Sequence, residues 1–247
     1  MPLSQTLAQT SLAASILAST IGTYIALSPP NPTSTHSTTP PSTGDVIRWL
    51  QLTNRHSTKI ALAPLGFASL YTSSLVLCHP RIPSFLLGHG AVENGLLTNT
   101  NLLTWSASTS VPLALIFCAG IPLRLVSYAS LGNNFTFALT EPDRLTTNGI
   151  YAYVQHPSYT GIVILVLSNL ALLGRIDGAA LSCLTPPRWY SGLRKLQALF
   201  FLPIGLSLLL FGVWTRVTQE EKMLKDEFGV EWEEWHSKTW RFIPWVF

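Results

Sequence analysis

The stretch Leu196–Thr215 reads LQALFFLPIGLSLLLFGVWT and contains no charged residue. A helix of about 20 apolar residues is long enough to cross the hydrocarbon core of a bilayer. The composition agrees, because 47% of the 247 residues are hydrophobic and only 11% are charged, whereas soluble domains carry roughly 25% charged residues. The stretch therefore predicts a transmembrane helix in a membrane protein.

Four further apolar stretches precede this one. They are Leu3–Leu27, Lys59–Cys78, Leu102–Val126 and the shorter Ile162–Leu173, which Tyr159–Gly161 extends. We therefore expect an all-α integral membrane protein with about five transmembrane helices. A signal peptide is the alternative for the first stretch, although no basic segment precedes it. Near the end of the third stretch, Arg124 is expected to reach the lipid headgroups.

The residues between the first two stretches differ in composition from both. Residues 28–44 read SPPNPTSTHSTTPPSTG, and their proline and hydroxyl content predicts an exposed connector. Trp49 follows the connector and is expected to lie at the membrane interface.

Charge and ligand spacing limit the classes of function. The net charge of +3 is small and dispersed, which argues against a nucleic-acid partner. The three cysteines and six histidines lack the spacing of disulfide frameworks or zinc sites. The sequence therefore predicts neither a metal site nor nucleic-acid binding.

A polar stretch follows the last apolar one. Arg216–Pro244 reads RVTQEEKMLKDEFGVEWEEWHSKTWRFIP. A helix is expected to continue to Phe228 and to end at Gly229, which gives the membrane domain a C-terminal helical cap. Arg216 and Glu220 are four residues apart and share one helix face. They could form a surface ion pair worth under about 1 kcal/mol, but a charge directly at the end of an apolar span favours a functional role.

A second polar stretch precedes the fourth apolar one. Residues 144–161 read RLTTNGIYAYVQHPSYTG. Its tyrosines and His156 could form an aromatic belt at the membrane surface. The alternative is a pocket for a flat, cationic or heteroaromatic ligand, because aromatic faces attract cations. Pro157 disfavours helix at His156 and can begin a new helix itself.

The distribution of Lys and Arg predicts the orientation. Alternating spans place most of these residues on the side that also receives both polar stretches. Positively charged loops remain in the cytosol, so both polar stretches and the C-terminus are expected to face the cytosol.

The two polar stretches together resemble the isoprenylcysteine carboxyl methyltransferase family of integral membrane enzymes. The matching text is LGNNFTF at residues 131–137, the stretch 144–161, R-x3-E-E at Arg216–Glu221, Phe228-Gly229, two aromatics at Trp232 and Trp235, and RFIP at residues 241–244. The resemblance divides the chain into N-terminal transmembrane helices, residues 1–130, and a catalytic methyltransferase region, residues 131–247.

The resemblance implies an S-adenosylmethionine-dependent enzyme of the endoplasmic reticulum. This enzyme would methylate the C-terminal carboxylate of farnesyl- or geranylgeranyl-cysteine in proteins. Arg216 would bind the substrate carboxylate and act in catalysis with Glu220. The residues implied to meet the cofactor are Asp143, Arg144, Leu145, Thr146, Tyr151, His156, Pro157, Ser158, Tyr159 and Glu220.

Two alternatives remain open, one because of departures from the family pattern and one because a related family has a similar His-Pro and Glu-Glu pattern. Gln155 and Thr146 stand where an arginine and an aliphatic residue are usual, and the loss of charge at Gln155 removes an expected anion or interface contact. A non-catalytic membrane scaffold derived from such an enzyme is one alternative. A phospholipid amine N-methyltransferase is the other, although an amine acceptor would give Arg216 no role.

Overall fold

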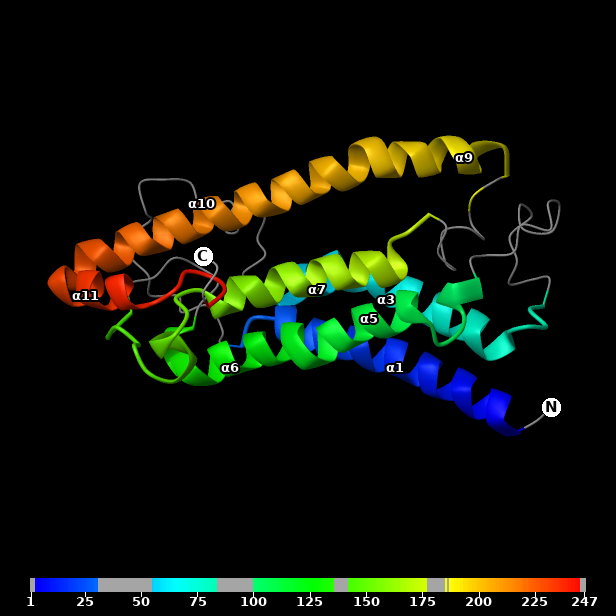
Figure 1. Cartoon of the computed structure of the whole chain (residues 1–247), viewed down its shortest axis with the longest axis horizontal. Helices are drawn as coiled ribbons and strands as arrows, with labels where there is room; N and C mark the ends of the chain where they lie inside the picture. The colour runs from blue at the N-terminus through cyan, green and yellow to red at the C-terminus, as the bar shows by residue number, and fades with distance from the viewer. Residues whose placement is uncertain are drawn as a thin grey trace.

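A computed structural model describes residues 3–30, 55–83, 100–135, 142–176, 185 and 187–244 (Figure 1). Within these residues the regular elements are helices, joined by one isolated parallel β-bridge between Val154 and Trp240. The predicted all-α class is therefore confirmed. Most of the predicted connector at 28–44, and Trp49, lie outside the described residues.

Four helical segments of the described chain are long and apolar enough to cross a membrane. They lie in α1 (Leu3–Leu27), in α3 (Arg55–Cys78), in the run α5 (Ala107–Leu115), η2 (Ile116–Gly120) and α6 (Ile121–Leu131), and in the run α9 (Pro187–Leu196), η5 (Gln197–Phe201) and α10 (Leu202–Phe228). The fourth predicted span is α7 (Pro157–Leu173), which has 17 residues. The chain is thus an all-α integral membrane protein.

The third span lies further along the chain than the apolar pattern indicated. Leu102 ends a short 3-10 helix, η1 (Thr100–Leu102), and α5 begins only at Ala107. The run then continues to Leu131 and ends before Gly132, whose φ is 54°. A left-handed glycine is a common helix stop because it has no Cβ to clash.

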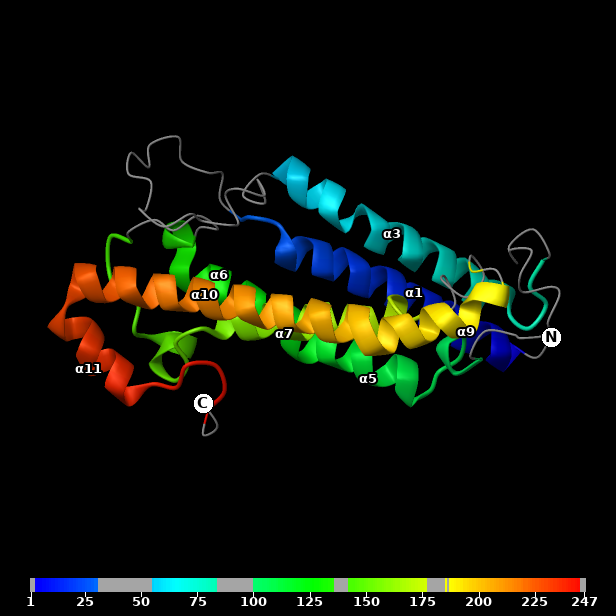
Figure 2. The same ribbon diagram turned by 90° about the horizontal axis from the view of Figure 1, so that it is seen from above.

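The helices α1, α3, α5, α6 and α7 form a bundle (Figures 1 and 2). Its main core contains buried aliphatic side chains of α1, α3, α5 and α7, among them Ile16, Leu75, Leu113 and Leu172. The start of α7 lies very close to α6, since a Cβ on Gly161 would lie 3.0 Å from Cγ of Arg124 in α6. This close approach fixes the first turn of α7 against α6.

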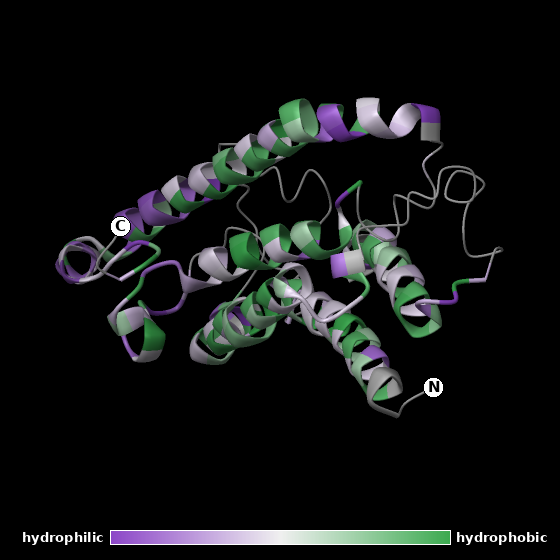
Figure 3. Ribbon diagram, turned by 45° about the vertical axis from the view of Figure 1, so that its right-hand side comes forward, coloured by the Kyte–Doolittle hydropathy of each residue, from purple (hydrophilic) through white to green (hydrophobic). Residues whose placement is uncertain are grey.

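The helix run α9–η5–α10 lies alongside the bundle but is exposed in its middle. No residue of its most apolar window is buried, and Figure 3 shows apolar residues along much of α10. Near its start, Gln197 accepts a hydrogen bond from the Ile176 amide (2.8 Å) and donates to the Gly174 carbonyl. An exposed apolar helix suits lipid surroundings, and its polar contacts lie toward its two ends.

Beyond the apolar part, α10 continues to Phe228 as predicted. Gly229, with φ of 50°, turns the chain into α11 (Val230–Lys238). In Figures 1 and 2, α11 lies at the opposite end of the molecule from the N-terminus. The predicted C-terminal helical cap is thus present, and its cytosolic orientation stays a prediction.

Candidate functional site

A cavity of about 330 Å³ lies where the bundle, α10 and α11 meet. Its walls include Leu27 at the end of α1, Ala61 and Leu62 of α3, and Trp235 of α11. The remaining walls come from the end of α6, the segment 142–156, the start of α7 and the middle of α10. Both predicted regions of the chain, 1–130 and 131–247, therefore contribute to one cavity.

Most of the predicted site residues line this cavity. They are Arg144, Leu145, Thr146, Tyr151, His156, Ser158, Tyr159, Arg216 and Glu220. Asp143 is not among the lining residues, and neither is Pro157, which begins α7 directly after His156. Residues that are far apart in the sequence thus meet around one cavity.

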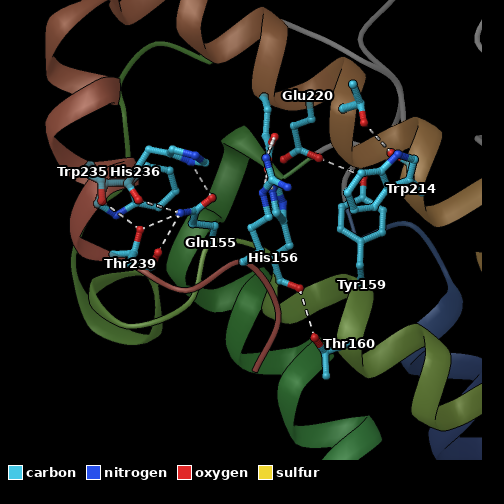
Figure 4. A network of polar contacts seen from close by, with 12 residues as sticks. Gln155, His156, Tyr159, Thr160, Trp214, Glu220, Trp235, His236 and Thr239 are labelled. Carbon is cyan, nitrogen blue, oxygen red and sulfur yellow. Dashed lines mark hydrogen bonds and ion pairs between the residues drawn. The ribbon is translucent and has the colours of Figure 1, made fainter. Parts of the chain in front are cut away.

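The wall contributed by α10 carries Arg216 and Glu220, and Figure 4 shows Glu220 next to Tyr159. The Tyr159 hydroxyl donates to Glu220 Oε2 (2.9 Å) and is also hydrogen-bonded to the Arg216 side chain. Arg216 is only 7% exposed. Arg216 is therefore buried beside a cavity, and it does not form the exposed surface ion pair that was the alternative.

The aromatic residues of the stretch 144–161 separate into two groups. Tyr153 is 69% exposed, as a residue of an aromatic belt would be. Tyr151 and His156 are buried and line the cavity with Tyr159. Burial, reinforced by the negative charge of Glu220, raises the pKa of Tyr151, so its hydroxyl stays protonated at neutral pH.

Glu221 connects α10 to two other segments. His156 Nε2 lies 3.3 Å from Glu221 Oε1, and Arg241 donates from Nε to Oε1 and from Nη2 to Oε2, each at 3.0 Å. A bidentate guanidinium–carboxylate pair is a strong, geometrically specific contact. The Glu221–Arg241 pair was not predicted from the sequence, because no local pattern pairs residues that lie 20 apart.

The segment that follows α11, residues 239–244, packs against the stretch 144–161. The backbone N–H of Gln155 donates to the Trp240 carbonyl (2.7 Å), and the backbone N–H of His156 donates to the Arg241 carbonyl (2.9 Å). Thr160 Oγ1 donates to the Phe242 carbonyl (3.1 Å). These bonds hold the C-terminal segment beside the cavity.

The side chain of Gln155 also forms hydrogen bonds with the C-terminal segment (Figure 4). It is 3% exposed. Its Nε2 donates to Thr239 Oγ1 (2.9 Å) and to the carbonyls of Thr239 (3.0 Å) and His236 (3.2 Å), and its Oε1 lies 2.9 Å from His236 Nδ1. The neutral amide thus holds the tail at the position where the family pattern has a cation.

His236 also stacks on Trp232, with ring centroids 4.4 Å apart. Burial lowers the pKa of His236, while the charge of Glu221 opposes this shift. Burial therefore favours the neutral imidazole at this position. Within the described part of the chain, no cluster of three or more His, Cys, Asp or Glu side chains is placed to hold a metal ion.

Arg124 does not extend to the lipid headgroups as expected. It is 2% exposed and lines the cavity from α6. Its Nε donates to the Ala26 carbonyl at the end of α1 (2.9 Å), Nη1 donates to Ser158 Oγ and Nη2 to the Tyr128 hydroxyl. These buried oxygens provide the partners that a guanidinium needs inside the protein, and the apolar sequence around Arg124 gives no sign of them.

Comparison with known proteins finds that part of this chain is similar to one family. A model of the isoprenylcysteine carboxyl methyltransferase (ICMT) family matches residues 113–187, so the predicted resemblance is confirmed for this region. No solved structure matches the chain.

Two curated proteins are similar to the chain, and both are named protein-S-isoprenylcysteine O-methyltransferase. The one from Schizosaccharomyces pombe is 29% identical over 131 residues, which cover 51% of this chain and 46% of that protein. The one from Dictyostelium discoideum is 25% identical over 179 residues, covering 65% of this chain and 64% of that protein. The chain thus spans about half to two thirds of the length of these relatives.

Proposed function

From the similarity to the isoprenylcysteine carboxyl methyltransferase family, we propose that this membrane protein transfers a methyl group from S-adenosylmethionine to the C-terminal carboxylate of a prenylated cysteine. The observation that carries this proposal is that buried Arg216 and half-buried Glu220 line one cavity together with the aromatic residues Tyr151, His156 and Tyr159. The acceptors would be farnesyl- or geranylgeranyl-cysteine at protein C-termini. The site would face the cytosol, in the endoplasmic reticulum.

Arg216 suits the binding of the acceptor. An α-carboxylate has a pKa near 3.5 and is already ionised at neutral pH, so the protein needs to hold it rather than deprotonate it. The planar guanidinium binds a carboxylate through two parallel hydrogen bonds and fixes its direction. Holding the reacting oxygen in line is the contribution that proximity makes to such a transfer.

Apolar residues of the same cavity suit the prenyl chain. Leu27 of α1, Leu62 of α3 and Ile162 of α7 line the space with the polar residues. Each buried CH2 group is worth about 0.8 kcal/mol, so a prenylated substrate partitions into a membrane before it reaches the site. A cavity lined by both charged and apolar side chains matches a substrate with a charged end and a hydrocarbon chain.

The residues present also fit the methyl donor. S-adenosylmethionine, when bound, supplies a methyl group whose bond to sulfur breaks, with the electron pair kept by sulfur, as the carboxylate oxygen bonds to the carbon. Glu220 provides a negative charge for a cationic ligand, and Tyr151 and Tyr159 provide aromatic faces. The segment Arg144–Thr146 completes this side of the cavity. The transfer neutralises the sulfonium and carboxylate charges and moves no proton, so no residue is needed as a general base.

The decisive variant is Arg216→Ala, assayed with labelled S-adenosylmethionine and a farnesylated cysteine analogue. We expect kcat/KM to fall by roughly 100-fold or more, because the bidentate carboxylate contact is lost. Arg188→Ala is the matched control, since Arg188 lies in the same helix run and is exposed at the opposite end. Undiminished activity of Arg216→Ala would remove the residue from the mechanism.

A panel of acceptors separates the proposal from its alternatives. Wild-type protein should methylate the prenylated carboxylate and leave phosphatidylethanolamine unmodified. Methylation of the phospholipid amine alone would instead establish an N-methyltransferase. A protein that binds no S-adenosylmethionine would be a scaffold, so titration of the purified protein with the cofactor completes the comparison.

A further inference from the structure

The cavity contains a second buried guanidinium, that of Arg124, in addition to Arg216. It lies on the α6–α7 side, where it donates to Ser158 Oγ, and Ser158 is itself 8% exposed and lines the same cavity. Arg124 is also held at the Ala26 carbonyl and at the Tyr128 hydroxyl. The guanidinium and the serine therefore have fixed positions before any ligand enters.

The direction of the hydrogen bond determines what Ser158 can offer. A guanidinium only donates, so the serine oxygen accepts from Arg124 and keeps its own proton for another acceptor. The positive charge behind the oxygen makes this proton a stronger donor. Ser158 also lies in the first turn of α7, where the helix dipole favours a negative ligand. All three features call for an anion with a hydrogen-bond-accepting oxygen.

The proposed ligands carry two carboxylates, one on the prenylcysteine and one on the amino-acid part of S-adenosylmethionine. Arg216 of α10 suits the first. Ser158 lies between His156 and Tyr159, in the segment that the family resemblance assigns to the cofactor. We propose that Arg124, acting through Ser158, forms a second carboxylate-binding point that recognises the amino-acid carboxylate of S-adenosylmethionine. This inference rests on the proposed function.

The test compares the binding of S-adenosylmethionine with that of its decarboxylated analogue, by calorimetric titration of purified protein in detergent. Wild-type protein should prefer the carboxylated ligand by about tenfold or more, as expected for a hydrogen bond to a charged group. Ser158→Ala should reduce this preference to within about threefold. Ser158→Thr keeps the hydroxyl and should restore it.

Ser168→Ala is the matched control, because Ser168 is also buried in α7 but does not line the cavity. It should keep the wild-type preference. The test substitutes Ser158 rather than Arg124, since Arg124 also joins α1 to α6 and its replacement can unfold the bundle.

Three outcomes would overturn the inference. If Ser158→Ala weakens both ligands by the same factor, the residue is only structural. If the preference is unchanged and the KM for the prenylcysteine rises instead, the pair binds the substrate carboxylate. If the wild-type protein binds neither ligand, the proposed function itself fails, and this result is distinct from the other two.

Discussion

The two sides of the cavity differ in how they are held. The α6–α7 side, with Arg124 and Ser158, belongs to the packed bundle, where a Cβ on Gly161 would lie 3.0 Å from Arg124 Cγ. The α10 side, with Arg216 and Glu220, belongs to a helix whose apolar part is not buried. One side is set by packing, whereas the other is positioned by polar contacts near the cavity. The α10 side is therefore the side expected to adjust when ligands enter.

Glu221 provides the contact whose loss should most disturb the α10 side. Glu221→Gln removes the charge that joins α10 to Arg241 and His156. Breaking a fully buried ion pair costs about 3–5 kcal/mol, and this pair should cost less because solvent reaches Arg241. We expect kcat/KM to fall by roughly 100-fold and hydrogen exchange in α11 to accelerate. The control is Glu227→Gln, an exposed residue of the same helix. Equal behaviour of the two variants would show that the Glu221 contacts do not position this wall.

Tyr159 joins the two sides directly, and its loss should have the next largest effect. Tyr159→Phe keeps the ring but removes the hydroxyl that contacts Glu220 and Arg216. A lost hydrogen bond to a charged group is worth about 1.5–3 kcal/mol, so kcat/KM should fall about tenfold or more while the thermal unfolding temperature changes little. Tyr153→Phe, at an exposed position, should match the wild-type rate. Full activity of Tyr159→Phe would mean that α10 is positioned without this hydroxyl.

Lowering the pH should destabilise α11, which packs next to α10. The pKa of His236 is lowered by burial, so the folded protein binds fewer protons there than the unfolded chain. The contribution of neutral His236 to stability is therefore complete above about pH 6.5 and is lost as the pH falls below this value. Hydrogen exchange in α11, corrected for the intrinsic pH dependence, should accelerate over this range. In His236→Asn this added dependence should disappear, and its persistence would assign the effect to another group.

The end of the run α9–η5–α10 that lies away from the cavity should matter least. Gln197→Leu removes the contacts with the backbone of Gly174 and Ile176. Hydrogen bonds between membrane helices average about 0.6 kcal/mol, so the thermal unfolding temperature should fall slightly while kcat/KM stays near the wild-type value. A large loss of activity would show that the site depends on both ends of the run α9–η5–α10 and not only on the polar contacts near the cavity.

The sequence predicted those elements that are determined by residues close together in the chain. The first span matches Leu3–Leu27, the helix after Arg216 ends at Gly229, and α7 begins at Pro157. In each case apolar length, glycine or proline acts on its neighbours in the chain. The third span shows the limit of this reasoning, because an apolar pattern continues through residues that form no transmembrane helix.

The contacts that complete the site could not be predicted from local patterns. Gln155 contacts Thr239 across 84 residues, and Arg124 contacts Ala26 across 98. Such pairs depend on the packing of the whole bundle. Arg124 at the end of an apolar stretch resembles an interfacial arginine, and only its buried partners identify it as part of the cavity wall. Likewise, the sequence at Gln155 indicated only that a positive charge is missing, and it gave no sign that the side chain binds the C-terminal segment.

The most direct test of this account is a structure of the protein with S-adenosylhomocysteine and a farnesylated cysteine analogue. We expect the substrate carboxylate to lie within about 3 Å of the Arg216 guanidinium, in the cavity shared with Tyr151, His156 and Tyr159. A carboxylate held elsewhere, with Arg216 turned away from both ligands, would contradict the central claim that α10 delivers the acceptor to the methyl donor.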